Sequence, residues 1–254
     1  MNILVTILQC RRVVLPYLFL RYTLPMMRAK IDGVVTVHLV RHEYLLPDIN
    51  PHETSRLPVA KELLAREWTE EGRYAPATIT THSEQFARYP SIPSRRIAAE
   101  FAERHIHDLH LWLEDDALVY DVDCADWLGI MGENRAAVYR TNAFGYINAA
   151  YYLCTSELDN ELLAALKEKD RWNLNASMYL NEGGEKILNL DSPRVEPLLT
   201  KLAGKRIAHL RPEAAARHNS RKPESTAALK SLVERVCPSE LGLLAIDFPN
   251  VAWV

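Results

Sequence analysis

This chain is poor in cysteine and has no surplus of positive charge. Its four cysteines (Cys10, Cys124, Cys154 and Cys237) are far apart and form no CxxC pair, which argues against a zinc site built from thiolates and against a disulfide scaffold. A reducing cytoplasm fits this usage best. The formal net charge of -3 leaves no excess of Lys and Arg, so nucleic acid is not expected as the main partner.

Long uninterrupted apolar runs are also missing. Residues 1–30 are apolar but are broken by Arg12, Pro16 and Arg21, whereas a membrane-spanning helix needs about 20 mostly apolar residues. The order of charged, apolar and small residues that marks a signal peptide is poorly met. We therefore expect an N-terminal extension that need not belong to the fold, with Met26 as a later start. A peripheral membrane contact is its functional alternative.

The rest of the composition is ordinary for a globular protein. The chain has 254 residues, of which 48% are hydrophobic and 25% charged, and it shows neither repeats nor low-complexity tracts. From residue 31 onward, strand-like and helix-like segments alternate. The first expected elements are a strand at 34–40, a helix at 53–68, a strand at 77–82, a helix at 95–105 capped by Ser94, and a strand at 109–113. This order predicts one α/β domain over 31–254, with a mostly parallel central sheet flanked by helices, as in Rossmann-like folds.

Further elements follow in the second half of the chain. They are strands at 135–140 and 147–155, a helix at 157–169, a loop-rich stretch at 171–191, a helix at 193–204 ended by Gly204, a strand at 206–210, a polar connector at 217–225 and a last helix at 225–236. An apolar tail at 241–248 closes the chain.

A row of acids ends the apolar run LHLWL: Glu114, Asp115 and Asp116. Side chains alternate along a strand, so Glu114 and Asp116 are expected on one side and Asp115 on the other. Ligands of parallel sheets bind at the carboxyl ends of the strands, which is where this row stands. Clustered carboxylates repel one another unless a positive group lies among them. A divalent cation is the expected partner, and Mg²⁺ or Mn²⁺ held by such oxygens commonly binds phosphates as well.

The acidic row resembles the Asp-x-Asp signature of GT-A glycosyltransferases, here written as Glu-Asp-Asp within WLEDDALVYD. The order of strands and helices from Val34 to Thr155 is similar as well. The resemblance implies a GT-A fold, with a nucleotide-binding half at 31–123 and an acceptor half at 124–254. It also implies a transferase whose nucleotide-sugar donor is bound through Mn²⁺ or Mg²⁺.

The same resemblance assigns roles on the donor side. Asp116 is the expected metal ligand. Glu114 is expected to face the ribose, a metal-bound water or the metal itself, and Asp115 is left ambiguous beside the donor. Metal-dependent members often add a histidine from a late strand, which is His209 here, with His218 as its rival.

Basic residues are expected near the diphosphate. Arg95, followed by Arg96, stands at a predicted helix start, where backbone N–H groups favour anions. Arg41, with its neighbours His38 and His42, is expected to line the nucleotide end of the first strand.

The acceptor is expected beyond the acidic strand, along NAFGYINAAYYL. Asn148 can hydrogen-bond a sugar hydroxyl, and Tyr146 offers a flat face for a sugar ring, as do Tyr151 and Trp172. The acceptor itself can be a saccharide, a lipid-linked sugar or a small molecule. The candidate catalytic bases are acids that the sequence does not rank: Asp170, Glu182 and Glu185.

Two other classes of protein stay open. Histidine phosphatases carry Arg-His-Gly after their first strand, and Arg41 and His42 match this pattern, with His82 and Arg88 as partners. Glu43 stands in place of the glycine and would put negative charge beside the phosphate. The remaining alternative is a binding protein on the same frame, with a purely structural acidic row.

Overall fold

The computed structural model of the chain describes residues 1–9, 12–42, 78–82, 91–142, 145–168, 179–180, 186–187, 195–218 and 223–253. The helix expected at 53–68, and most of the loop-rich stretch expected at 171–191, lie outside these described residues.

Seven of the described strands form one central sheet, in the order β10, β6, β7, β4, β1, β2, β3. They are β1 (Asn2–Gln9), β2 (Val34–His42), β3 (Thr78–His82), β4 (Leu109–Glu114), β6 (Ala136–Val138), β7 (Tyr151–Thr155) and β10 (Ile207–His209). The strands β1 to β4 are parallel, as are β6 and β10, while β7 is antiparallel to its neighbours β4 and β6. The expected mostly parallel α/β sheet in a single domain is confirmed.

The structure corrects the expectation for residues 1–30, because they lie within the fold. The strand β1 occupies the middle of the sheet, with Val5 paired to Val37 of β2 on one side and to Leu111 of β4 on the other. Its side chains are buried from Ile3 to Gln9. A strand covered on both faces has no polar alternation, which is why its sequence looks like a featureless apolar run.

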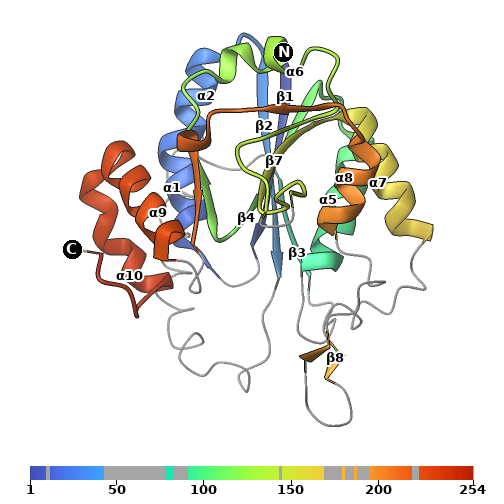
Figure 1. Cartoon of the computed structure of the whole chain (residues 1–254). Coiled ribbons are helices and arrows are strands. Elements are labelled where there is room, and N and C mark those ends of the chain that lie inside the picture. Colours follow the sequence, from blue (N-terminus) through green and yellow to red (C-terminus); the bar gives the residue numbers. More distant parts are fainter. Residues whose placement is uncertain are drawn as a thin grey trace.

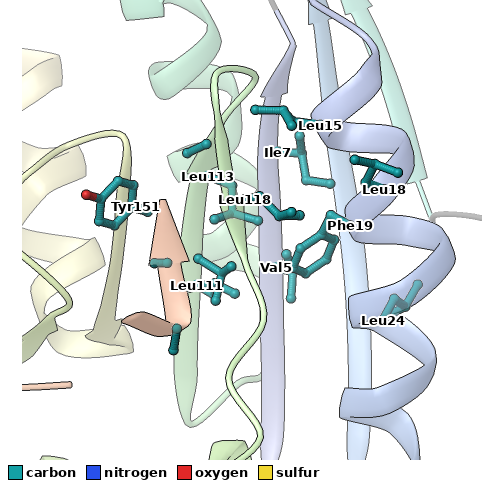
Figure 2. Close-up of a cluster of buried hydrophobic side chains, with 14 of the residues drawn as sticks. Val5, Ile7, Leu15, Leu18, Phe19, Leu24, Leu111, Leu113, Leu118 and Tyr151 are labelled. Atoms are coloured by element: carbon teal, nitrogen blue, oxygen red, sulfur yellow. The ribbon is translucent and has the colours of Figure 1, made fainter. Parts of the chain in front are cut away.

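Helices cover both faces of the sheet (Figure 1). One face carries α1 (Val14–Leu18), a π-helical turn (Phe19–Thr23), α2 (Leu24–Lys30), α9 (Pro223–Val236) and α10 (Leu244–Asp247). The other carries α5 (Ser91–Arg104), α7 (Ser156–Glu168) and α8 (Val195–Ala203). Figure 2 shows the hydrophobic core on the face that α1 and α2 cover. There Val5 and Ile7 of β1 and Leu111 of β4 lie opposite Leu18 and Phe19. No described helix is both long and apolar enough to cross a membrane.

Smaller elements complete the described part of the chain. They are α6 (Trp127–Met131), a two-stranded sheet of β5 (Ala117–Val119) and β11 (Ala215–Arg217), an antiparallel pair of β8 (Tyr179–Leu180) and β9 (Lys186–Ile187), and 3₁₀ turns at Cys124–Asp126, Pro212–Ala214 and Pro238–Leu243. The strand β11 lies in the stretch before the expected polar connector, next to the acidic row, and α9 begins at Pro223.

Two element starts differ by four residues from the sequence-based expectations. The helix α5 begins at Ser91, so Ser94 lies inside it; the Ser94 hydroxyl is 2.8 Å from Nε2 of His82 instead of capping the helix. The strand expected from residue 147 begins at Tyr151, because Asn148 first forms a turn in which its side chain accepts a hydrogen bond from the backbone N–H of Ala150. The end of α8 is as expected, since Gly204 follows with a φ of 62°, a left-handed conformation that favours glycine.

Candidate functional site

The three acids lie at the carboxyl edge of the sheet, as expected. The strand β4 ends at Glu114, and Asp115 and Asp116 form the turn that leads into β5. Backbone hydrogen bonds fix this turn from both sides: the N–H of Asp115 donates to the carbonyl of Leu8, and the N–H of His218 donates to the carbonyl of Asp116. The row is therefore held between the end of β1 and the chain that leaves β11.

Glu114 is paired with a buried arginine. Its Oε1 accepts a hydrogen bond of 2.7 Å from Arg95, whose side chain is only 1% exposed and also donates to the carbonyl of Ala149. Burial raises the pKa of the Glu114 carboxyl, but the charges of Arg95 and Arg217 outweigh that effect and lower it overall. Arg95 was expected at a helix start near the diphosphate; the structure gives it a buried position inside α5, against Glu114.

Arg217 and Arg12 neutralise the other two acids. Arg217 Nε donates to Asp116 Oδ2 over 3.0 Å, and its NH2 lies 3.9 Å from Glu114 Oε2. The backbone N–H of Arg12 donates to Asp115 Oδ2, while its guanidinium lies 3.7 Å from Asp115 and 3.8 Å from Asp116. Glu114 and Asp116 thus reach the same guanidinium. Arginines therefore supply positive charge beside the acidic row, where the sequence analysis expected a divalent cation.

One oxygen of the row has no hydrogen-bond partner in the part of the chain that the structure describes. Asp116 is 7% exposed, and its Oδ1 is buried with no hydrogen-bond partner among the described residues. Burial raises the pKa of the Asp116 carboxyl to about 6, even though Arg217 and Arg12 act to lower it. The two arginines therefore leave this carboxylate incompletely compensated.

The two candidate histidines lie in different places. His209 ends β10, which is separated from β4 by β6 and β7, or roughly 14 Å at the usual spacing of strands. His218 directly follows Arg217, lies in the turn bonded to Asp116, and is 8% exposed. Burial and the charges of Arg12 and Arg217 lower the pKa of His218, so its ring is neutral at neutral pH, the form that binds metals. The structure brings the rival histidine to the acids, and leaves His209 at the far edge of the sheet.

Arg41 lies on the same edge, at the end of β2. Its Nε donates to Gln9 Oε1 over 3.0 Å, and Gln9 in turn donates to the carbonyl of Arg12. His38 is turned into the sheet, with Nε2 3.0 Å from Thr80 Oγ1. The side chain of His42 and the whole of Arg88 lie outside the described residues, so the phosphatase pattern is not assembled in the part that is described.

A cavity of about 270 Å³ opens next to the acids, between the β6–β7 connection, β11 and α9. Its lining residues are Arg140, Thr141, Asn142, Asn148, Tyr151, Ala216, Arg217, Glu224, Ser225 and Ala228. Arg217 joins it to the acidic row, since its NH1 donates to Asn148 Oδ1 over 3.4 Å. The expected acceptor residues Asn148 and Tyr151 line this cavity. Tyr146 is 37% exposed and is not among the lining residues.

Some expected residues cannot be placed, and others were missed. Trp172 and the candidate bases Asp170, Glu182 and Glu185 lie outside the described residues. Arg217 and Arg12 were not anticipated. Arg217 directly precedes the candidate His218, which is the one signal that could have drawn attention to it, whereas Arg12 was taken only as an interruption of an apolar stretch.

No protein family and no curated protein matches the sequence. Several solved structures resemble it distantly. The galactosyltransferase LgtC, in complex with donor and acceptor sugar analogues, is 12% identical over 93% of this chain and 96% of that one, with a TM-score of 0.46. S. aureus TarS 1–349 with UDP-GlcNAc is 12% identical over 93% and 68% of the two chains, with a TM-score of 0.42. The glycosyltransferase GlyE of Streptococcus pneumoniae TIGR4 is 15% identical over 83% of this chain, with a TM-score of 0.38, and this chain spans 45% of its length. Similarity at this level decides nothing about function, which has to be argued from the chain's own geometry.

Proposed function

We propose that this protein is a metal-dependent glycosyltransferase that moves a sugar from a nucleotide-sugar donor to a saccharide, lipid-linked or small-molecule acceptor. One observation carries the proposal: Asp116, with a buried oxygen that has no partner among the described residues, stands at the carboxyl edge of a parallel sheet, and its partner Arg217 lines a cavity. In parallel sheets this edge is the usual place for nucleotide ligands.

The residues at this edge fit Mg²⁺ or Mn²⁺. Asp116 Oδ1 is the first ligand, with His218 from the adjoining turn and Glu114 from the strand end as the nearest further candidates. Among the described residues these three do not form a compact group of ligand atoms, and Arg217 holds the other oxygen of Asp116. When bound there, the cation would stabilise the negative charge that develops on a departing nucleoside diphosphate.

The arginines and the cavity complete the assignment. Arg12 and Arg217 place positive charge where a diphosphate would lie, and Asp115 orients Arg12 through its backbone and its guanidinium. Arg41, two strand spacings from Glu114 across β1, is assigned to the nucleotide. Asn148 and Tyr151 in the cavity wall are assigned to the acceptor. This leaves Arg95 as the residue that positions Glu114, without contact to the donor.

Thermal unfolding of the whole chain tests the proposal. We expect a nucleoside diphosphate with Mn²⁺ or Mg²⁺ to raise the melting temperature by about 5 °C or more, and either component alone to have a much smaller effect. A panel of nucleotide sugars then identifies the donor, and release of nucleoside diphosphate in the presence of candidate acceptors tests transfer.

Two variants make the test specific. Asp116→Asn is expected to abolish the metal-dependent shift, whereas Asp126→Asn, at an exposed acid near α6, should keep it. Uniform absence of a shift in the wild-type chain with every nucleotide sugar and both metals would contradict the transferase and favour a binding protein. Metal-free hydrolysis of a phosphomonoester that is lost in His42→Ala would instead support the phosphatase.

A further inference from the structure

A second group of metal-ligating side chains lies at the other end of β4, away from the acidic row. His107 stands just before the strand, His110 lies in it, and Asp159 reaches them from α7. One ligand atom from each lies within 4.8 Å of the others, and the three residues are at most 7% exposed. Among the described residues this is the one group of three or more His, Cys, Asp or Glu with that geometry.

Both histidines are oriented from behind by a hydrogen bond at the ring nitrogen that faces away from Asp159. His107 Nδ1 lies 2.7 Å from the carbonyl of His105, and His110 Nε2 lies 2.7 Å from Thr6 Oγ1 of β1. Histidines that bind metals usually have their other nitrogen held in this way by a carbonyl or a hydroxyl. The nitrogens that remain, His107 Nε2 and His110 Nδ1, both face Asp159 Oδ2.

The other oxygen of Asp159 is fixed separately. Trp112 Nε1 donates to Oδ1 over 2.9 Å, and the thiol of Cys154 donates to the same atom over 3.2 Å. These two hydrogen bonds fix the orientation of the Asp159 carboxylate, so that Oδ2 is turned toward the histidines.

The buried carboxylate of Asp159 requires positive charge beside it. Asp159 is 2% exposed, and in the described part of the chain no Lys or Arg pairs with it. Because a carbonyl only accepts, Nδ1 of His107 carries a proton, so Nε2 of His107 faces the carboxylate 3.2 Å away either with a second proton or with its lone pair. A second proton on His107, or a metal ion between the two atoms, provides the positive charge that this buried carboxylate needs.

We propose that His107 Nε2, His110 Nδ1 and Asp159 Oδ2 supply three ligands of a bound zinc ion that joins β4 to α7. Two imidazoles and a carboxylate are ligands that Zn²⁺ prefers, and tetrahedral zinc with bonds of about 2.0–2.1 Å separates its ligand atoms by about 3.3 Å. The His107–Asp159 distance of 3.2 Å already meets this value, whereas His110 Nδ1, now 2.5 Å from Oδ2, has to withdraw by about 1 Å.

Elemental analysis of the purified whole chain, dialysed against metal-free buffer, tests the proposal. We expect about one zinc per chain in the wild-type protein, and at least a tenfold loss of zinc in Asp159→Asn, which keeps the side-chain shape and an oxygen for Trp112. Asp116→Asn is the matched control: it should retain the zinc, because that acid belongs to the proposed donor site at the opposite end of the strand.

A further variant separates a metal site from a hydrogen-bond network. Thr6→Val removes the hydroxyl that is hydrogen-bonded to His110 Nε2. We expect it to weaken zinc binding about tenfold in a chelator competition, with an unchanged circular dichroism spectrum. Absence of zinc from the folded wild-type chain, or a different metal in its place, would overturn the proposal, as would zinc that persists in folded Asp159→Asn. These outcomes do not depend on whether the protein transfers sugars.

Discussion

At the scale of single residues, the acidic row is held in place by charge that the chain itself supplies. Arg217 contacts Asp116, Glu114 and Asn148 at once, so it links the candidate metal position to the cavity. Asp116 is buried while Arg217 is partly exposed. Removing the arginine would leave the carboxylate without its nearest positive partner, and that costs more than losing an exposed pair.

We therefore expect Arg217→Gln to lower the free energy of unfolding by about 1–3 kcal/mol, measured by urea denaturation at neutral pH. Arg235→Gln provides the comparison, because Arg235 donates to the carbonyl of Glu213 over 2.8 Å at an exposed position. Its loss should cost less than about 1 kcal/mol. Equal effects of the two substitutions would show that the contact between Arg217 and Asp116 contributes no more to the free energy of unfolding than an exposed contact does.

A buried histidine makes stability depend on pH. His38 is fully buried and its ring stacks on Phe101. Burial, with smaller effects from His110 and His105, lowers the pKa of His38 from 6.5 to about 4. The unfolded chain therefore takes up a proton at a higher pH than the folded chain does. The contribution to stability is complete above pH 6.5 and is lost as the pH falls from 6.5 to about 4.

For His38, a shift of this size corresponds to about 3 kcal/mol across that interval. We expect His38→Gln to unfold with a visibly flatter dependence on pH between 4 and 6.5, measured by urea denaturation at several pH values. His209→Gln, at an exposed position on β10, should keep the wild-type slope. Identical slopes in the wild type and His38→Gln would contradict the assignment.

At the scale of elements, the start of α1 depends on the far end of the chain. The backbone N–H groups of Val13 and Val14 donate to Asp247 Oδ2 over 3.0 and 2.7 Å. Asp247 belongs to α10, so a residue from the C-terminal segment satisfies N–H groups that the helix itself cannot. This contact ties α10 to the face of the sheet that α1 covers.

We expect Asp247→Ala to lower the free energy of unfolding by about 1–2 kcal/mol, because two buried N–H groups lose their acceptor. Asp247→Asn keeps an oxygen acceptor and should cost less. Both are measured by thermal and urea denaturation at neutral pH. An alanine variant as stable as the asparagine variant would mean that the cap does not contribute.

At the scale of the whole molecule, the sheet depends on β1. This strand lies between β2 and β4 and is hydrogen-bonded to both. Without it, these two strands would not be joined into one sheet. Residues 1–9 thus complete the core on both faces, with Ile7 facing one cluster and Leu8 the other. Their apolar character is explained by burial.

We expect Val5→Asp to abolish cooperative unfolding or to cost more than about 4 kcal/mol, because it places a charge in the centre of the sheet. Val34→Asp is the matched control, since Val34 is 59% exposed at the start of β2, and it should change stability by less than about 1 kcal/mol. The measurement is chemical denaturation followed by circular dichroism. A folded, cooperative Val5→Asp variant would contradict the central position of β1.

Much of the fold was predictable because burial leaves a local pattern. The strands at Val34–His42 and Leu109–Glu114, and the helices at Ser156–Glu168 and Val195–Ala203, follow from apolar periodicity, caps and glycine. The strand at Asn2–Gln9 has an equally strong apolar signal, but being buried on both faces removes the alternation that would have identified it. A short apolar run of this kind does not show whether it packs in a core or elsewhere.

The sequence by itself determined the α/β class, the order of most strands and helices, and the position of Glu114 and Asp116 at the end of a buried strand. These features depend on neighbours along the chain. The tertiary structure decided that Arg12 and Arg217 neutralise the acids, that Arg95 is buried, and that His218 rather than His209 lies beside Asp116. Arg217 and Asp116 are 101 residues apart in the chain. Such partners are chosen by how the sheet and helices pack, and no local pattern of charge or hydrophobicity encodes that choice.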